Sequence, residues 1–365
     1  MVATMANNGS KLTIAVACGG TGGHTFPGLA TANALRARGH NVEVWLSGRD
    51  IESRALKAWD GPVFHTGARP LTKPQLIHLP GSVARCWRRM GSLRPDALLA
   101  MGSYASLPPG WAARLRGVPI VLHEANAVAG KATDFFAKSA AAVAWSFGNP
   151  PAYLGEKAVS TGLPVRTALA GRPPLPGFEP REGVFTVLVT GGSQGCRFLN
   201  ESVPAACAIL AGHGRAKAIR VIHQTGAADE EIVRKRYADA GIEALVCAFM
   251  DDMGGAFAAA DVVLCRAGAA TCAELALCAK PAMLVPLPSA VRDHQRLNAR
   301  FFADEGAAIC LEQATLSPDD IAARFEGFMD DPSSLAALRN AMAKFSSADA
   351  AERLADLVEK AAGKR

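Results

Sequence analysis

The chain has 365 residues, half of them hydrophobic, and a formal net charge of +6. This length accommodates two domains, each with a core of its own. No apolar run reaches the roughly 18 to 20 residues of a membrane-spanning helix, and the N-terminus lacks the pattern of a signal peptide. We therefore expect a cytosolic protein, and its frequent glycines favour the α/β class with its tight strand-to-helix turns.

The nine cysteines do not form the pattern of a metal site or of a disulfide framework. There is no C-x-x-C, and the spacing of Cys265, Cys272 and Cys278 matches no zinc motif. An odd number of cysteines in a chain without an export signal favours reduced thiols. We predict structural cysteines and no metal site.

The first predicted strand, Leu12–Cys18, runs directly into a glycine-rich loop and a predicted helix. Residues 17–28 read ACGGTGGHTFPG, with Pro27 in the expected first turn, where its missing N–H costs nothing. Bare backbone amides and the positive end of a helix dipole bind anions, so this loop is typical of a phosphate site. The dinucleotide fingerprint G-x-G-x-x-G fails at Thr25, and neither a Walker lysine nor a D-x-D pair is present.

A basic segment follows in the first half of the chain. Residues 61–95 contain no Asp or Glu but six basic residues, Arg69, Lys73, Arg85, Arg88, Arg89 and Arg94. Apolar residues recur there at helical spacing, at Leu79, Val83, Cys86, Trp87, Met90 and Leu93. The pattern predicts an amphipathic helix, which either rests on an anionic surface (a membrane or a nucleic acid) or turns its apolar stripe to the core.

The second half repeats the opening pattern. A strand at 184–190 precedes the loop GGSQG at 191–195 and a helix at 198–210, and the proline-rich segment 171–183 has the composition of a linker. Further strands are predicted at 41–46, 97–100, 120–123, 220–223, 261–265 and 281–285. Strands alternating with helices imply parallel sheets, whose ligands bind at the carboxyl ends of the strands. An amphipathic helix is expected near 350–362.

Eight motifs together resemble, in order and spacing, those of the MurG family of glycosyltransferases. They are GGTGGH (19–24), GSYAS (102–106), HEANAVAG (123–130), TGLPVR (161–166), GGSQG (191–195), FMDDM (249–253), CRAGAATCAE (265–274) and DHQRLNA (293–299). The resemblance covers residues 12–350. Ser103 departs from it, because it stands in a motif that usually reads Gly-Gly-Tyr.

The resemblance implies a GT-B fold of the α/β class, with two Rossmann-like domains whose parallel sheets face a central cleft. It implies an acceptor-binding, membrane-facing domain at 11–166 and a donor-binding domain at 167–348. We expect the C-terminal helix, 349–365, to pack back on the first domain. The implied reaction transfers GlcNAc from UDP-GlcNAc to the 4-hydroxyl of the MurNAc of lipid I, with inversion. The product is lipid II, the precursor of peptidoglycan in cell-wall growth, cell shape and cell division.

Donor-binding residues are carried over motif by motif. They are Thr21, Gly22, Gly23, Asn126, Arg166, Ser193, Met250, Ala269, Ala270, Thr271, Cys272, Ala273, Glu274, Gln295 and Asn298. The chemistry of these residue types agrees with the implied roles: we expect Glu274 to accept hydrogen bonds from ribose hydroxyls and Met250 to read uracil through its backbone. We expect Gln295 and Asn298 to reach sugar hydroxyls. The helix after Gly268 points its N-terminus at the departing diphosphate, so no metal or other cofactor is expected.

Two residues are candidates for the catalytic base. His24 lies beside the first glycine loop, and its structural alternative is to cap the helix or to hydrogen-bond a phosphate. Glu124 follows the strand at 120–123, and its alternatives are to orient the acceptor or His24, or to be a surface or helix-capping carboxylate. Gly19, Gly20 and Tyr104 are expected to contact the acceptor. His123 is expected to support the fold, and Asp251 and Asp252 to cap a helix rather than bind metal.

The resemblance also favours membrane contact for the basic segment, at the cytoplasmic face of the cell membrane. Leu76, Ile77, Leu79, Trp87 and Met90 are the candidates for the contact, and no nucleic-acid partner is expected. Other functions stay open: another GT-B UDP-sugar glycosyltransferase, a UDP-sugar epimerase, or a nucleotide-sugar sensor without catalysis. The failed dinucleotide fingerprint argues against a dehydrogenase.

Overall fold

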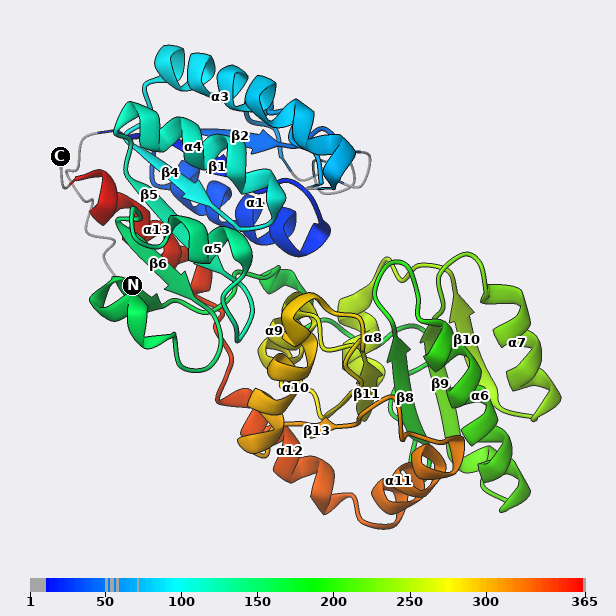
Figure 1. Ribbon diagram of the computed structural model, residues 1–365. Helices are drawn as coiled ribbons and strands as arrows, with labels where there is room; N and C mark the ends of the chain where they lie inside the picture. The colour runs from blue at the N-terminus through cyan, green and yellow to red at the C-terminus, as the bar shows by residue number, and fades with distance from the viewer. Residues whose placement is uncertain (1–10, 50–51, 53–55, 57–58, 71, 364–365) are drawn as a thin grey trace. The chain divides into compact units, whose positions relative to one another are not determined.

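The computed structural model describes residues 11–49, 52, 56, 59–70 and 72–363. The chain divides into two compact units. The first takes in Met1–Ala125, Ala129–Val165 and Asp349–Arg365, and the second takes in Asn126–Val128 and Arg166–Ala348. Each unit is an α/β domain built on a parallel sheet (Figure 1).

Within its described residues, the first unit contains a seven-stranded parallel sheet of order β3-β2-β1-β4-β5-β6-β7. The strands are β1 (Thr13–Ala17), β2 (Asn41–Leu46), β3 (Val63–His65), β4 (Ala97–Ala100), β5 (Ile120–Glu124), β6 (Ala142–Trp145) and β7 (Ala158–Ser160). The helices are α1 (Gly22–Ala37), α3 (Leu79–Leu93), α4 (Leu107–Arg116), α5 (Lys131–Phe136) and α13 (Ala350–Ala362), with 3₁₀ turns η1 (Lys73–His78), η2 (Tyr104–Ser106) and η3 (Ala152–Lys157).

Both faces of this sheet are covered by helices. Successive side chains of a strand point to opposite faces, so Ile14 and Val16 pack with α1 and α13, while Ala15 and Ala17 pack with α3, α4 and α5. Figure 1 shows α13 in red beside β5 and β6, although it comes from the other end of the chain. Gly28 lets α1 approach β1 closely, because a Cβ there would lie 2.2 Å from Cβ of Cys18.

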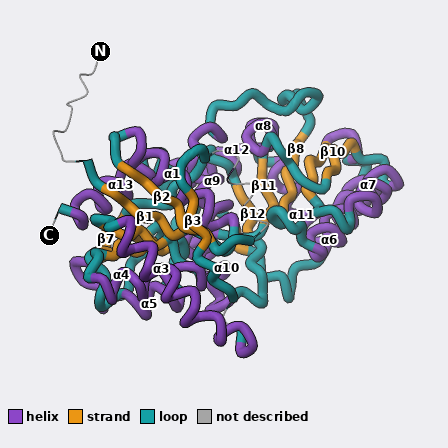
Figure 2. The backbone as a smooth tube through the Cα atoms, turned by 90° about the horizontal axis from the view of Figure 1, so that it is seen from above, coloured by secondary structure: helices purple, strands orange, loops and turns teal. Residues whose placement is uncertain are grey.

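The second unit repeats this plan, with a six-stranded parallel sheet of order β10-β9-β8-β11-β12-β13 in its described residues. Figure 2 shows the strands of the sheets in orange with the helices in purple around them. The strands are β8 (Phe185–Thr190), β9 (Ile219–Gln224), β10 (Glu243–Cys247), β11 (Val262–Cys265), β12 (Ala282–Leu284) and β13 (Ile309–Cys310). The helices are α6 (Arg197–Gly212), α7 (Glu230–Asp239), α8 (Met253–Ala259), α9 (Ala269–Leu277), α10 (His294–Asp304), α11 (Pro318–Asp330) and α12 (Ser333–Ala343), with 3₁₀ turns η4 (Thr167–Leu169), η5 (Ala216–Ala218) and η6 (Val291–Asp293).

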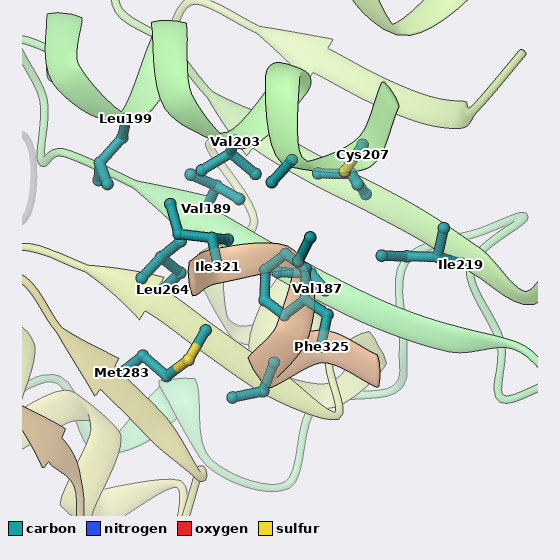
Figure 3. Packing of buried hydrophobic residues seen from close by; sticks show 14 of the residues in the cluster. Val187, Val189, Leu199, Val203, Cys207, Ile219, Leu264, Met283, Ile321 and Phe325 are labelled. Atoms are coloured by element: carbon teal, nitrogen blue, oxygen red, sulfur yellow. The ribbon is translucent and has the colours of Figure 1, made fainter. Parts of the chain in front are cut away.

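The core of the second unit lies between β8 and the helices α6 and α11. Figure 3 shows Val187 and Val189 facing Val203 of α6 and Phe325 of α11, all of them fully buried. A continuous apolar strand of this kind is typical of a parallel sheet covered on both faces. The core therefore holds β8 rigidly, and with it the loop that follows.

The strands predicted from the sequence are found within two residues of their expected bounds, and α13 occupies 350–362 as expected. The linker prediction for 171–183 is wrong. This segment belongs to the second unit, where buried Arg220 donates hydrogen bonds to the carbonyl oxygens of Gly177, Phe178 and Glu179. The units instead divide after Val165 and after Ala348.

None of the described helices is long and apolar enough to cross a membrane. All nine cysteines lie in the described part of the chain and are free thiols, as predicted. Burial raises the pKa of Cys207 and of Cys272 to about 12, so both are protonated near neutral pH.

Candidate functional site

The predicted site residues of the first unit gather at the carboxyl edge of its sheet. Because the strands are parallel, the loops after β1, β2, β4, β5 and β6 all leave at this edge. The loop after β1 contains Gly19 and Gly20, the loop after β4 contains Ser103, and β5 ends in Glu124. This is the edge at which open α/β sheets bind ligands.

The first glycine loop is held tightly against the loop after β2. A Cβ on Gly19 would lie 2.5 Å from the backbone nitrogen of Ser47, and Gly20 has a φ of +109°. The Gly20 N–H donates a 2.7 Å hydrogen bond to Oε1 of Glu52, so it is turned away from any ligand. The amides of Thr21, Gly22 and Gly23 begin α1 and carry the positive end of its dipole.

His24 lies in the first turn of α1, close to the loop after β4 and to β5. A Cβ placed on Gly102 would lie 3.7 Å from Cε1 of His24, an ordinary van der Waals distance, so the imidazole lies directly beside this loop. His123 is buried, and its Nε2 lies 3.3 Å from the carbonyl oxygen of Gly162. Burial lowers the pKa of His123 to about 4, and the nearby His24 adds to this effect. His123 is therefore neutral and structural, in line with its predicted role.

Glu124 serves as a cap for α5. Its Oε2 accepts hydrogen bonds from the Gly130 N–H at 2.7 Å and from the Thr133 hydroxyl at 2.6 Å. The side chain is buried, with 5 % of its residue surface exposed. Both donors lie at the N-terminus of α5, so Glu124 acts as the helix-capping carboxylate that the sequence offered as an alternative to a catalytic base.

Tyr104 begins η2, directly after the strained residue Ser103. Ser103 has a φ of +66°, a region that favours glycine, and so its place in a motif that usually reads Gly-Gly-Tyr is costly, at about 1 to 3 kcal/mol. The Tyr104 hydroxyl lies 3.4 Å from Nη1 of Arg49, after β2. Tyr104 also lines a small pocket, together with Arg69, Gln75, His78, Ser82 and Pro108.

In the second unit, the loop 191–195 fits closely against the loop after β9. A Cβ on Gly195 would lie 1.8 Å from the carbonyl oxygen of Thr225, and Ser193 is exposed at the tip. Gln224, which the sequence analysis missed, ties this loop to Met250. Its Nε2 donates to the Gly192 carbonyl at 2.7 Å, and its Oε1 accepts from the Met250 N–H at 2.9 Å.

The contact between Gln224 and Met250 changes the prediction for Met250. The Met250 N–H already donates to the buried side chain of Gln224, so only the backbone carbonyl of Met250 is left to bind uracil. A polar residue at the end of an apolar strand was the signal for Gln224 in the sequence. The predicted strand stopped one residue short of it.

Glu274 lies on α9 and faces Arg166. Oε1 of Glu274 is 3.7 Å from Nη2 of Arg166, and the carboxylate side chain is one-fifth exposed. Burial raises the pKa of Glu274, and Arg166 opposes this effect in part. Cys272 and Ala273 are buried, so their contribution to a ligand is limited to the backbone, whereas Ala269, Ala270 and Thr271 are partly exposed.

The amide of Asn298 is engaged inside the second unit. Its Oδ1 accepts from the Ala127 N–H at 2.9 Å, and its Nδ2 lies 3.2 Å from Oδ1 of Asn126. The same amide nitrogen donates to the Ala267 carbonyl, and the residue is completely buried. Asn298 thus positions Asn126. On the same helix, Oε1 of Gln295 accepts a hydrogen bond from the Leu287 N–H.

Asp252 caps α8 by accepting a hydrogen bond from the Gly255 N–H at 3.0 Å, as predicted. Across the part of the chain that the structure describes, no group of three or more His, Cys, Asp or Glu side chains is arranged to hold a metal ion.

Comparison with known proteins places this geometry in a family. The glycosyltransferase family 28 N-terminal domain matches residues 14–145, and the family 28 C-terminal domain matches residues 186–354. The chain is 42 % identical over 324 residues to a protein of Bordetella parapertussis, covering 86 % of this chain and 88 % of that one. It is 40 % identical over 367 residues to a protein of Burkholderia orbicola, covering 97 % of each chain.

Both relatives are named UDP-N-acetylglucosamine–N-acetylmuramyl-(pentapeptide) pyrophosphoryl-undecaprenol N-acetylglucosamine transferase. Among solved structures, the chain is similar to the crystal structure of Acinetobacter baumannii MurG, with a TM-score of 0.79 and 31 % identity. That similarity covers 96 % of this chain and 99 % of the other. The chain belongs to glycosyltransferase family 28 and, within it, to the MurG family.

Proposed function

We propose that this protein transfers GlcNAc from UDP-GlcNAc to the 4-hydroxyl of the MurNAc of lipid I, with inversion at the anomeric carbon, and so forms lipid II. The observation that carries the proposal is 40 % identity over 97 % of the chain to a transferase of that name. The two glycine loops support the proposal, because each follows a buried strand at the ligand-binding edge of its sheet.

His24 is the proposed base that removes the proton of the attacking hydroxyl. Its ring lies at the carboxyl edge of the first sheet, against the bare backbone of Gly102. A positioned base contributes roughly 10² to 10⁴-fold to such a step. Glu124 is the weaker candidate, because its carboxylate accepts hydrogen bonds from Gly130 and Thr133 at the start of α5.

The second unit is proposed to hold the UDP-sugar and to stabilise the leaving diphosphate. The N-terminus of α9, with Ala269, Ala270 and Thr271 partly exposed, offers backbone amides and a helix dipole to that charge. Glu274 is proposed to accept hydrogen bonds from the ribose. These groups supply the stabilisation that a metal ion supplies in other transferases, and we propose that the reaction needs no metal.

We further propose that the basic segment makes the protein a peripheral enzyme at the cytoplasmic face of the cell membrane. Leu76, Ile77 and Trp87 are exposed on η1 and α3, with Ile77 79 % exposed. Met90 is wrong as a contact residue, because only 1 % of its surface is exposed and it faces the core. Arginines near anionic lipid gain roughly 1 kcal/mol each.

A transfer assay with radiolabelled UDP-GlcNAc and a lipid I analogue tests the reaction. We expect a product of the mass of lipid II, with turnover unchanged by a chelator such as EDTA. Absence of the product would contradict the transferase, and loss of turnover on chelation would contradict the metal-free step. Turnover of UDP-GlcNAc to UDP-ManNAc without acceptor would instead identify an epimerase.

A further inference from the structure

Glu52 is a buried carboxylate that the proposed reaction does not use, although it touches the first glycine loop. Only 2 % of its surface is exposed. Its Oε1 accepts from the Gly20 N–H at 2.7 Å, from the Ser47 N–H at 3.2 Å and from the Ser47 hydroxyl. Its Oε2 accepts from the Gly48 N–H at 2.8 Å and the Arg49 N–H at 3.1 Å.

These contacts join two loops at the carboxyl edge of the sheet. Four of the five donors lie in the turn after β2, and the remaining donor is the backbone of the loop after β1. Burial alone would raise the pKa of Glu52, but the hydrogen bonds from Ser47, Gly20, Gly48 and Arg49 outweigh it and lower the pKa. The carboxylate is therefore ionised near neutral pH, when it accepts all five bonds.

We propose that Glu52 is a positioning residue of the transfer reaction, which acts by fixing the backbone of the loop Gly19–Gly23. By taking the Gly20 N–H inward, it sets the course of the chain into the first turn of α1. That turn carries the amides of Gly22 and Gly23 and the side chain of His24. The inference rests on the proposed function, which assigns the proton transfer to His24, and on the resemblance, which implies donor binding by Gly22 and Gly23.

Glu52→Gln is the decisive variant. An amide has one acceptor oxygen and one NH₂ donor, so one of the two oxygen positions of Glu52 would present N–H to two backbone N–H groups. Either the Gly20 side or the Gly48 side must then separate. A shift of about 1 Å in a reacting group costs on the order of 10²-fold in rate.

Glu43→Gln is the matched control. Glu43 is a buried carboxylate of β2, 4 % exposed, and it accepts hydrogen bonds from Arg89 and from Nε1 of Trp45, away from the glycine loop. Its loss removes a buried charged hydrogen-bond acceptor from the same sheet, but leaves the loop after β1 in place. Both variants are compared at a temperature well below their own melting points, so that each is fully folded.

We expect kcat/KM for the lipid I analogue to fall about 10²-fold in Glu52→Gln and less than threefold in Glu43→Gln. We also expect at least a threefold rise in the KM of one of the two substrates, which loss of folded enzyme alone does not produce. Equal losses in the two variants, or a kcat/KM of Glu52→Gln within twofold of the unmodified protein, would overturn the proposal.

Should Glu52→Gln fail to fold, Ser47→Ala decides, since it removes only the hydroxyl donor to Oε1. An unchanged kcat/KM in Ser47→Ala would then overturn the proposal, and a threefold to tenfold loss would support it. Activity of the unmodified protein separates the two hypotheses: if it transfers no GlcNAc, the proposed function fails, whatever Glu52 does.

Discussion

His24, His123 and Glu124 lie in one short stretch of sheet edge and have three different environments. His123 is buried and holds the Gly162 carbonyl, and Glu124 caps α5. His24 lies in the first turn of α1, where the neighbouring Gly102 has no side chain. Among these three residues, His24 combines partial exposure with a place beside the loop amides. It is therefore the residue whose removal tests the chemistry most directly.

We predict that His24→Ala lowers kcat by roughly 10² to 10⁴-fold, because the attacking hydroxyl loses its base. The KM for UDP-GlcNAc should change less than threefold, since the proposed donor groups of the second unit are untouched. Steady-state kinetics with a lipid I analogue measures both. His213→Ala is the control: this histidine pairs with Glu326 on the surface, and its loss should leave kcat unchanged. A normal kcat in His24→Ala would rule out the base.

At the scale of single residues, the sequence indicated which residues are candidates for the site, but not which hydrogen bonds hold them in place. The motifs, through local spacing and residue type, predict that His24, Glu274 and the glycine loops belong to the site, and the assays proposed here test that prediction. The motifs did not predict that Gln224 holds the Met250 N–H or that Glu52 holds Gly20. These bonds join residues 26 and 32 positions apart, and only the packing of neighbouring parallel strands, β9 with β10 and β1 with β2, brings them together.

At the scale of elements, apolar runs predicted the buried strands, since a parallel strand covered on both faces has few polar residues. The linker prediction for the proline-rich segment 171–183 failed because composition is local. The docking of this segment depends on Arg220, which comes from β9. The sequence also did not predict which side of α3 faces the core. Its spacing predicted an amphipathic helix, but only the fold shows that Cys86 and Met90 form its buried face.

The exposed face of η1 and α3 leads to a prediction about membranes. The double variant Ile77→Ala/Trp87→Ala should bind vesicles with anionic lipid at least tenfold more weakly. Burial of each apolar side chain in the membrane is expected to stabilise binding by about 1 to 3 kcal/mol, and the variant loses both. Cosedimentation with phosphatidylglycerol vesicles measures the binding. Ile232→Ala, which removes an exposed isoleucine of α7 in the second unit, should bind normally. Equal binding by both variants and the unmodified protein would contradict this role of the segment.

At the scale of the whole molecule, each unit contains one buried neutral histidine, which makes its folding sensitive to acid. Burial lowers the pKa of His123 to about 4 and that of His223 to about 3. In the unfolded chain both take up a proton near pH 6.5. Below that pH the unfolded state binds protons that the folded state rejects, so stability falls as the pH falls. The raised pKa of Glu274 acts in the opposite direction.

We predict that the stability lost between pH 7.5 and pH 5 is about 2 kcal/mol for each histidine, or a melting-point decrease of about 4 to 8 °C in each unit. His223→Gln should melt lower at pH 7.5, because His223 bonds Tyr237 and Asn200. The melting point of its second unit should nevertheless fall less between pH 7.5 and pH 5, since Gln does not titrate. Calorimetric scans at both pH values measure this difference. A decrease as steep in His223→Gln as in the unmodified protein would show that other groups, carboxylates above all, set the acid limit.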